Sequence, residues 1–346
     1  MSESPEGPSG GATEAQARMR TSSFRLRVVP LGTSAGRPTL ARGASALAVV
    51  AEGAWVLCDC GEGAQVAALR AGLSFSRLDA VLITHLHGDH FNGLPGLLGT
   101  LGLEGRERPL TVAGPRGIAS LLEALARAGS LGIGGLPLLI VELEGEGGRL
   151  ELPADAAISF GVESRALTHR VPTFGYRVSL RDRPGTLDVE AALAAGVPRG
   201  PLLAEVKEGR TVMLPDGRRL EGSKFLGPVR RGPSVAYALD TTPCRAAVEL
   251  GRGADVLVHE STYEHARAEL AHARGHSTGV EAARIALEAS AGTLLLTHFS
   301  PSVDGERVAD EARSIHGRVV AAADQQGLEV TAPDPAPAAS SAELRP

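Results

Sequence analysis

The sequence predicts an α/β fold in which several strands end at one shared site. Apolar stretches with the length of strands alternate with helix-like stretches along the 346-residue chain, the pattern of layered α/β proteins. Six apolar stretches also stop at a metal-ligand type of residue, at Asp59, His85, His169, Asp240, His259 with Glu260, and His298. Because sites in layered α/β folds lie at one edge of the strands, we expect these side chains to meet there.

The composition is that of a globular protein. Hydrophobic residues make up 43% of the chain, enough for a sizeable core. No run of about 18 apolar residues appears, so no membrane span is expected. Residues 1–22 lack periodicity and the apolar core of a signal peptide, which predicts a disordered tail and a cytoplasmic protein. The net charge of -5 argues against a generally basic nucleic-acid-binding surface but not against a local one.

The first half of the chain begins with an alternating strand, Phe24 to Val29. The glycine loop that follows, Leu31 to Gly36, lacks the lysine and hydroxyl ending of a nucleotide-binding loop, so we interpret it as a tight turn and not as a phosphate cradle. Further strands are predicted at 45–50, 54–58, 78–83, 110–113, 138–143 and 157–166, and helices at 64–71, within 91–101, and at 116–128.

The three cysteines are too few and too unevenly spaced for a disulfide framework. Cys58 and Cys60 lie at the end of an apolar run, and we interpret them as buried thiols, with a cysteine-based zinc site as the alternative.

The densest group of ligand-type side chains follows the predicted strand 78–83, at His85, His87, Asp89 and His90. A strand end is rigid, and the turn after it can direct all four into one pocket, as closely spaced metal ligands require. We therefore predict a metal site here, with a polar surface loop as the alternative. Three distant residues, His169, Asp240 and His298, complete a set large enough for two ions bridged by one carboxylate.

After a predicted strand at 174–180 the residue composition of the chain changes. Residues 181–232 hold many prolines, glycines and charges, and we interpret them as an insertion that projects from the domain; a surface segment without function is the alternative.

After the insertion, strands are predicted at 234–240, 254–260, 293–297 and 328–331, and helices at 278–289 and 304–315. Thr278 and Glu281 fit a capping box, and His276 precedes that helix, whose N-terminus favours anions such as phosphate.

These motifs resemble the metallo-β-lactamase superfamily, whose hallmark is the His-x-His-x-Asp-His pattern found at 85–90. Within it the chain is similar to the ribonuclease Z family of endonucleases, which mature the 3′ end of transfer RNA. The more specific similarity lies in the segments His259 to Thr262 and His276 to Thr278, together with the Gly200-Pro201 pair inside the insertion.

The resemblance implies an αββα sandwich, with two mixed sheets between outer helices, over residues 23–332. It implies a flexible arm inserted at about 182–212, and residues 333–346 are predicted to be a disordered tail. The family's arm grips the elbow of transfer RNA, and Gly200, Pro201 and Lys207 stand in its matching part. The family is commonly a homodimer in which one subunit's arm helps bind substrate for the other.

The resemblance also implies residue roles. One zinc ion would be held by His85, His87 and His169, and the other by Asp89, His90 and His298. Asp240 would bridge the two zinc ions, and Asp89 would also act as general base. His276 would contact the scissile phosphate or protonate the leaving oxygen, and Glu260 would orient His276. From its place at a strand end, Asp59 is expected to orient a ligand histidine from behind.

The implied reaction is zinc-dependent removal of 3′ trailers from precursor transfer RNA by a metal-bridged hydroxide. It leaves a 3′-hydroxyl on the transfer RNA and a 5′-phosphate on the trailer. Manganese uses the same ligand types and is the alternative ion; DNA is not an expected partner. A rival interpretation keeps the metals but assigns small phosphodiesters or sulfate esters as substrates. A weakly catalytic RNA-binding scaffold is a third interpretation, which no feature of the sequence favours.

Some features depart from the family pattern. Thr242 stands where an arginine is frequent and Ser261 where an alanine is usual, although neither is a ligand position. Acidic residues offset the arginines of the arm, namely Asp182, Asp188, Glu190, Glu205, Glu208 and Asp216. His265, His272 and His316 have no matching role and are predicted to lie at the surface.

Overall fold

The computed structural model describes residues 24–132, 135–153 and 160–333. The predicted N-terminal tail, nearly all of the predicted C-terminal tail, and the first residues of the strand predicted at 157–166 lie outside this part of the chain. Among the described residues, no helix is both long and apolar enough to cross a membrane.

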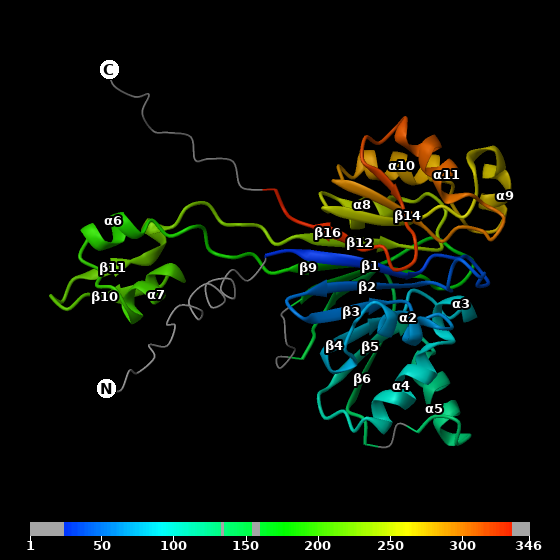
Figure 1. The fold of residues 1–346 in the computed structure, drawn as a ribbon, viewed down its shortest axis with the longest axis horizontal. Helices are drawn as coiled ribbons and strands as arrows, with labels where there is room; N and C mark the ends of the chain where they lie inside the picture. Colours follow the sequence, from blue (N-terminus) through cyan, green and yellow to red (C-terminus); the bar gives the residue numbers. More distant parts are fainter. Residues whose placement is uncertain (1–23, 133–134, 154–159, 334–346) are drawn as a thin grey trace, which may run out of the picture.

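Two seven-stranded mixed sheets form the centre of the molecule (Figure 1). The first has the order β16-β1-β2-β3-β4-β5-β6 and the second the order β15-β14-β13-β12-β9-β8-β7. The strands of the first sheet are β1 (Leu26–Gly32), β2 (Ala46–Ala51), β3 (Ala54–Cys58), β4 (Leu78–Leu82), β5 (Leu110–Pro115), β6 (Leu138–Leu143) and β16 (Leu328–Val330). Those of the second are β7 (Gly147–Leu150), β8 (Phe160–Ala166), β9 (Phe174–Leu180), β12 (Ser234–Ala238), β13 (Val256–Glu260), β14 (Thr293–Thr297) and β15 (Val319–Ala321).

Helices cover the outer face of each sheet, which confirms the predicted αββα sandwich (Figure 1). On the first sheet lie α2 (Ala64–Arg70), α4 (Leu94–Leu103) and α5 (Ile118–Arg127), with α3 (Gly88–Phe91) at the sheet edge. On the second lie α8 (Arg245–Gly251), α10 (Gly279–Glu288) and α11 (Gly305–Arg313), with α9 (Ala268–Ala273) beside them. Short 3-10 turns occur at η1 (Phe75–Arg77), η2 (Gly222–Phe225) and η3 (His265–Arg267).

The central strands, among them β3, β4, β12 and β13, are buried on both faces and are therefore apolar on both. Along β13, Val256 and Val258 pack between the two sheets, whereas Leu257 packs against the outer helices. Tyr176 and Tyr237 fill the layer between the sheets and are almost fully buried. A strand buried on both faces is continuously apolar instead of alternating, which is why these segments stood out in the sequence.

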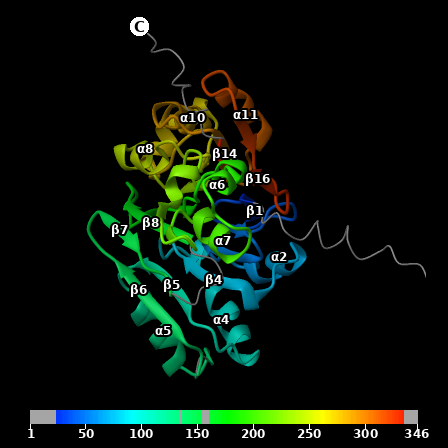
Figure 2. The same cartoon turned by 90° about the vertical axis from the view of Figure 1, so that its left-hand side faces the viewer.

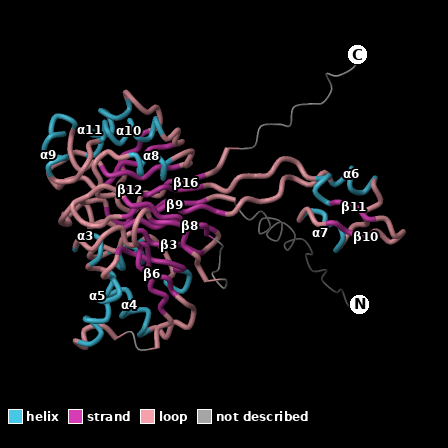
Figure 3. The backbone as a smooth tube through the Cα atoms, turned by 180° about the vertical axis from the view of Figure 1, so that it is seen from behind, coloured by secondary structure: helices cyan, strands magenta, loops and turns pink. Residues whose placement is uncertain are grey.

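The segment between β9 and β12 projects from the sandwich on two long connecting stretches (Figures 1 and 3). Its outer end, seen end-on in Figure 2, contains α6 (Val189–Ala194), α7 (Pro201–Lys207), β10 (Thr211–Met213) and β11 (Arg219–Glu221). These elements enclose a small apolar core made of Ala192, Val197, Val206, Val212 and Leu214.

The projecting segment is longer than the predicted arm of about 182–212. β10 pairs with β11, which lies beyond residue 212. The two connecting stretches also pair with each other, since Arg183 and Arg230 exchange both backbone N–H···O bonds at 2.9 and 3.0 Å. We call residues 181–233 the arm from here on.

Two further differences have simple causes. The predictions omitted β7 and β15, because β7 begins with two glycines, which have low strand propensity, and β15 has only three residues. The prediction that His316 lies at the surface was wrong. Its side chain is buried, with Nε2 lying 3.0 Å from the Ala291 carbonyl oxygen and Nδ1 lying 3.2 Å from that of Arg318.

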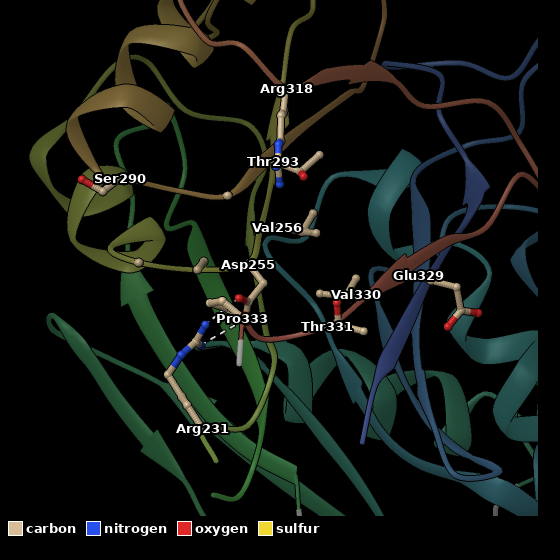
Figure 4. Close-up of a pocket in the computed structure, with 13 residues that line it drawn as sticks. Arg231, Asp255, Val256, Ser290, Thr293, Arg318, Glu329, Val330, Thr331 and Pro333 are labelled. Atoms are coloured by element: carbon tan, nitrogen blue, oxygen red, sulfur yellow. Dashed lines mark hydrogen bonds and ion pairs between the residues drawn. The ribbon is translucent and has the colours of Figure 1, made fainter. Parts of the chain in front are cut away.

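A pocket of about 420 Å³ lies at the N-terminal ends of β13 and β14 (Figure 4). Arg231 crosses it to pair with Asp255. Gly253 and Ser290, which follow α8 and α10, also line the pocket. None of the strand-end histidines or aspartates lines this pocket, so it is separate from the site described next.

Candidate metal centre

Three of the predicted site residues leave their strands in the same unusual backbone conformation. Asp59 follows β3, Asp240 lies just after β12, and His298 follows β14; their φ angles are 56°, 48° and 58°. The left-handed region costs a residue other than glycine about 1–3 kcal/mol and is found mainly where function requires it. These three strand ends are therefore sites of local strain.

The histidine cluster extends across the turn between β4 and α3. His85 lies three residues beyond the last assigned residue of β4, and His87 precedes α3 with an extended backbone. Asp89 and His90 then occupy the short helix. This turn brings Nε2 of His85 to 2.8 Å from Nδ1 of His87.

The described side chains form three groups that could each hold a metal ion; two of them share no residue, and the third, Asp240, His276 and His298, overlaps both. Within each group the potential ligand atoms lie within 4.8 Å of one another. The first group is His85, His87, His169 and Asp240, and the second is Asp89, His90 and His298. The structure thus brings together all seven residues for which the sequence predicted a ligand role.

Asp240 contacts the first and the second group through different oxygens. Its Oδ2 lies 3.5 Å from Nε2 of His85, and its Oδ1 lies 3.1 Å from Nε2 of His298 and 3.4 Å from Nε2 of His90. A carboxylate with one oxygen on each side is the arrangement that a bridging ligand needs.

The donor set fits divalent cations. Nε2 of His169 and Oδ1 of Asp240 are buried without a hydrogen-bond partner, and buried polar atoms are otherwise nearly always satisfied. In the described part of the chain, the ion pairs of Asp59, Asp89 and Asp240 run to histidines alone. Buried carboxylates without lysine or arginine partners favour a bound cation.

The protonation of the rings suits metal binding as well. Burial, with the neighbouring His90, lowers the pKa of His85 to about 2, and burial also lowers the pKa values of His87 and His169. The neutral ring is the form that binds a metal. Burial opposes protonation of His90, but the carboxylates of Asp240 and Asp59 outweigh it and raise the pKa of His90. A divalent ion bound beside His90 would give these carboxylates the positive charge that the protonated ring otherwise supplies.

Asp59 holds the ring of His90 from behind, as the sequence predicted for a ligand histidine. Its Oδ2 lies 2.7 Å from Nδ1 of His90. The carboxylate also accepts hydrogen bonds from the backbone N–H and hydroxyl of Thr84, and from the hydroxyl of Tyr237 at 3.0 Å. Tyr237 was absent from the predicted site, because its place on the facing sheet is visible only in the fold.

Two other rings have a similar second partner. Nδ1 of His169 lies 2.8 Å from the Gly275 carbonyl oxygen, and Nδ1 of His298 lies 3.0 Å from the Thr262 hydroxyl. Gly275 has a φ of +79°, and a Cβ there would come within 2.7 Å of the His169 ring. Such partners fix the orientation of ligand rings and tune their basicity.

His276 and Glu260 form a pair next to the metal-ligand groups. Nδ1 of His276 lies 3.0 Å from Oε1 of Glu260. Burial favours the neutral ring, but the Glu260 carboxylate outweighs burial and raises the pKa of His276 to about 9. The pairing with Glu260 thus stabilises the protonated ring, in which Nε2 can donate a proton. The predicted capping box of Thr278 and Glu281 is present at the start of α10.

One further contact at the site was not predicted. The backbone N–H of Gly36 donates a hydrogen bond to Oδ2 of Asp89 at 2.7 Å. The sequence favoured a tight turn over a phosphate cradle for this glycine loop, and no signal in it shows that the loop reaches Asp89.

The remaining predicted residues lie elsewhere. Gly200 and Pro201 begin α7 and Lys207 ends it, at the outer end of the arm and away from the histidines (Figure 1). Cys58 and Cys60 are buried, and burial raises both thiol pKa values. His272 is exposed as predicted, whereas His265 is half-buried with Nδ1 lying 3.1 Å from the Thr278 hydroxyl.

Comparison with known proteins gives a consistent result. The metallo-beta-lactamase superfamily model matches residues 40–155. The chain is 44% identical over 317 residues to "Ribonuclease Z" of Synechococcus sp. (strain WH7803), covering 88% of this chain and 97% of that protein. It is 42% identical over 278 residues to "Ribonuclease Z" of Acaryochloris marina (strain MBIC 11017), covering 80% and 86%.

Solved structures have the same fold. The human tRNase Z, short form, superposes with a TM-score of 0.62 at 26% identity, covering 87% of this chain and 98% of that one. The metallo-beta-lactamase fold protein YhfI from Bacillus subtilis also superposes with a TM-score of 0.62, at 19% identity, over 88% and 99% of the two chains. With the curated relatives at 42–44% identity over most of their length, the chain belongs to the ribonuclease Z family of endoribonucleases in the metallo-β-lactamase superfamily.

Proposed function

We propose that this chain is a zinc-dependent endoribonuclease of the cytoplasm that removes 3′ trailers from precursor transfer RNA. Cleavage would leave a 3′-hydroxyl on the transfer RNA and a 5′-phosphate on the trailer. The observation that carries the proposal is the pair of ligand groups joined by Asp240, next to the pair of His276 and Glu260, in a chain whose relatives are named for this activity.

Each ligand group would hold one zinc ion. His85, His87 and His169 would bind the first, Asp89, His90 and His298 the second, and Asp240 both. Two ions bound here supply charge for the scissile phosphate and a hydroxide nucleophile at neutral pH. Imidazole and carboxylate ligands also suit manganese, which is the alternative ion.

Asp89 would act as general base as well as ligand. Burial alone would raise the pKa of its carboxyl group, but hydrogen bonds with His298 and His90 outweigh burial and hold that pKa well below its usual range. The group is therefore ionised, so its oxygens can accept a hydrogen bond from the attacking water. The hydrogen bond from Gly36 fixes the direction of Oδ2.

His276 would protonate the leaving oxygen. Its Nδ1 is occupied by Glu260, so Nε2 is the atom that donates to the substrate. Glu260 is fully buried and also accepts hydrogen bonds from the backbone N–H groups of Thr241 and Ser277. These bonds hold the carboxylate, and through it the imidazole, in one orientation.

The arm would grip the transfer RNA away from the cleaved bond. It is a small folded unit on two connecting stretches that pair at isolated points, and Lys207 is exposed at the end of the helix that Gly200 and Pro201 begin. A projection of this kind can contact a distant part of a large substrate without touching the metal centre. We also propose a homodimer in which the arm of one subunit contacts substrate held by the other.

The experiment that tests the function compares two substrates. The zinc-loaded protein is given a 3′-extended precursor transfer RNA and, separately, a small chromogenic phosphodiester. The proposal expects a kcat/KM for the precursor that is larger by at least about 100-fold, since contacts far from the cleaved bond contribute to transition-state binding. Comparable kcat/KM values would favour a small-molecule esterase instead.

A further inference from the structure

The loop of residues 33–43 contacts the candidate metal centre at two points. The backbone N–H of Gly36 donates to Oδ2 of Asp89 at 2.7 Å. The backbone N–H of Ala35 donates at 2.9 Å to the carbonyl oxygen of Phe299, the residue after His298. Any movement of this loop would therefore change the surroundings of two proposed metal ligands.

The tip of the loop has little burial to hold it. Gly36, Arg37 and Pro38 are exposed, and Leu40 is fully exposed. Ser34 contributes internal bonds, with its hydroxyl donating to the Arg37 carbonyl at 2.7 Å. Because an exposed loop gains little from packing, the anchoring of its two ends decides how rigidly the tip is placed.

Both ends of the loop are bound by one side chain. The hydroxyl of Thr33 donates to Oδ1 of Asp324 at 2.8 Å, and the backbone N–H of Gly43 donates to Oδ2 of Asp324 at 2.6 Å. The ends are also joined directly, since Ser34 N–H donates to the Gly43 carbonyl at 3.0 Å. Asp324 thus holds both ends of the loop, and we call its two hydrogen bonds to Thr33 and Gly43 the clamp.

Asp324 is itself well placed to act as a fixed point. It lies in the turn between β15 and β16, where the chain passes from the second sheet to the first. On one side of it, Ala322 N–H donates to the Leu296 carbonyl in β14; on the other, Gln325 N–H donates to the Pro30 carbonyl in β1. The clamp is therefore tied to both sheets of the sandwich.

We propose that Asp324 is a positioning residue for the active site. Its carboxylate fixes the loop of residues 33–43, and the Gly36 N–H of that loop in turn orients the carboxylate of Asp89. The inference rests on the role proposed for Asp89 in cleavage. Asp324 does not touch the metal-ligand groups, so it acts only through the loop.

Two substitutions separate the geometry of the clamp from its charge. Asp324→Ala removes both acceptors. Asp324→Asn keeps one acceptor for Gly43 N–H and places an amide that can donate to the Thr33 hydroxyl oxygen. The control is Val319→Ala, in the adjacent strand β15, which loosens packing in the same region and leaves both bonds of the clamp in place.

The first readout is amide hydrogen exchange in the zinc-depleted proteins, which is independent of catalysis. In Asp324→Ala, exchange of residues 33–43 should increase by at least about 10-fold relative to both wild type and Val319→Ala, because the loop opens locally. An unchanged exchange rate in this loop would contradict the proposal that Asp324 fixes residues 33–43.

The second readout is steady-state cleavage of the small phosphodiester and of precursor transfer RNA. Asp324→Ala should lower kcat by about 10-fold on both substrates with KM nearly unchanged, as loss of supporting contacts behind a site usually does, and Asp324→Asn should restore most of the loss. A loss equal to that of Val319→Ala, or no rescue by Asp324→Asn, would contradict the positioning role. If the wild type cleaves neither substrate the proposed function fails, while the exchange measurement still decides the clamp.

Discussion

The imidazole of His276 lies 3.0 Å from the carboxylate of Glu260, which is completely buried. Three other groups donate hydrogen bonds to the same carboxylate: the backbone N–H groups of Thr241 and Ser277 and the hydroxyl of Thr262. Glu260 therefore cannot turn towards a substrate, and its effect on catalysis must pass through His276. Two expected outcomes follow from this arrangement.

Removing the imidazole should affect the reaction without affecting metal binding. In His276→Ala we expect kcat to fall by about 10²–10⁴-fold, the usual contribution of a positioned general acid. The zinc content, measured after dialysis by elemental analysis, should equal that of wild type. A loss of about one ion per chain would show that His276 is a ligand together with Asp240 and His298, with which it also forms a compact group.

Glu260→Gln should reduce both stability and activity. A glutamine has one acceptor where the carboxylate has two, so at least one buried N–H donor loses its partner, which costs about 1–3 kcal/mol in the free energy of unfolding. Chemical denaturation measures this loss. Since the ring of His276 also loses its counter-charge, kcat should fall while KM for precursor transfer RNA changes little; wild-type values of both kcat and unfolding free energy would refute the proposed role.

Asp240→Ala should remove both metal ions, because Asp240 has one oxygen near each ligand group. We expect less than one zinc ion per chain after dialysis against a weak chelator. Asp216→Ala, at an exposed turn of the arm, is the matched control and should keep the wild-type content. One full ion retained in Asp240→Ala would show that the carboxylate serves a single ion.

Metal removal should destabilise the fold. Zinc at 100 times its dissociation constant adds about 2.7 kcal/mol of stability to a protein that binds it only when folded, so a strong chelator should lower the melting temperature by several degrees. In Asp240→Ala the chelator should cause little further change. An equal drop in both proteins would mean that the stabilising ion binds elsewhere.

Shortening the arm should weaken binding of the large substrate alone. Arg183 and Arg230 are joined by a pair of backbone hydrogen bonds, so residues 184–229 can be replaced by an Asn-Gly turn that joins the two connecting stretches directly at this pair. The KM for precursor transfer RNA should rise at least about 10-fold, as loss of a remote contact surface predicts, with the small phosphodiester unaffected. Equal losses on both substrates would argue that the arm supports the fold and does not bind RNA.

Much of the fold was visible in the sequence because the central strands are buried on both faces. The predicted ranges of β3 and β14, which are buried along almost their whole length, coincide with the observed ones. The arm was harder, since its helices and strands are short and pack only against each other around a core of small and medium-sized side chains. Local patterns of that length do not distinguish a folded unit from a loop.

The candidate ligands were recognisable because six apolar stretches end at histidine, aspartate or glutamate and because four ligand-type residues fall within positions 85–90. The supporting contacts were not recognisable in the same way. The hydroxyl of Tyr237 reaches Asp59 across the space between the two sheets, and Asp324 meets Thr33 across 291 positions of sequence. Tyrosine in a strand and aspartate in a turn are common, so only the three-dimensional arrangement identifies these two.

The central claim is tested most directly by mapping the cut in a 3′-extended precursor transfer RNA and identifying its end groups. Zinc-loaded protein is incubated with the labelled precursor, and the two products are analysed for terminal hydroxyl and phosphate groups. The account predicts a single cut after the discriminator nucleotide, with a 3′-hydroxyl on the transfer RNA and a 5′-phosphate on the trailer, and no cut by Asp89→Ala. A precursor left intact by a protein that hydrolyses small phosphodiesters would contradict it.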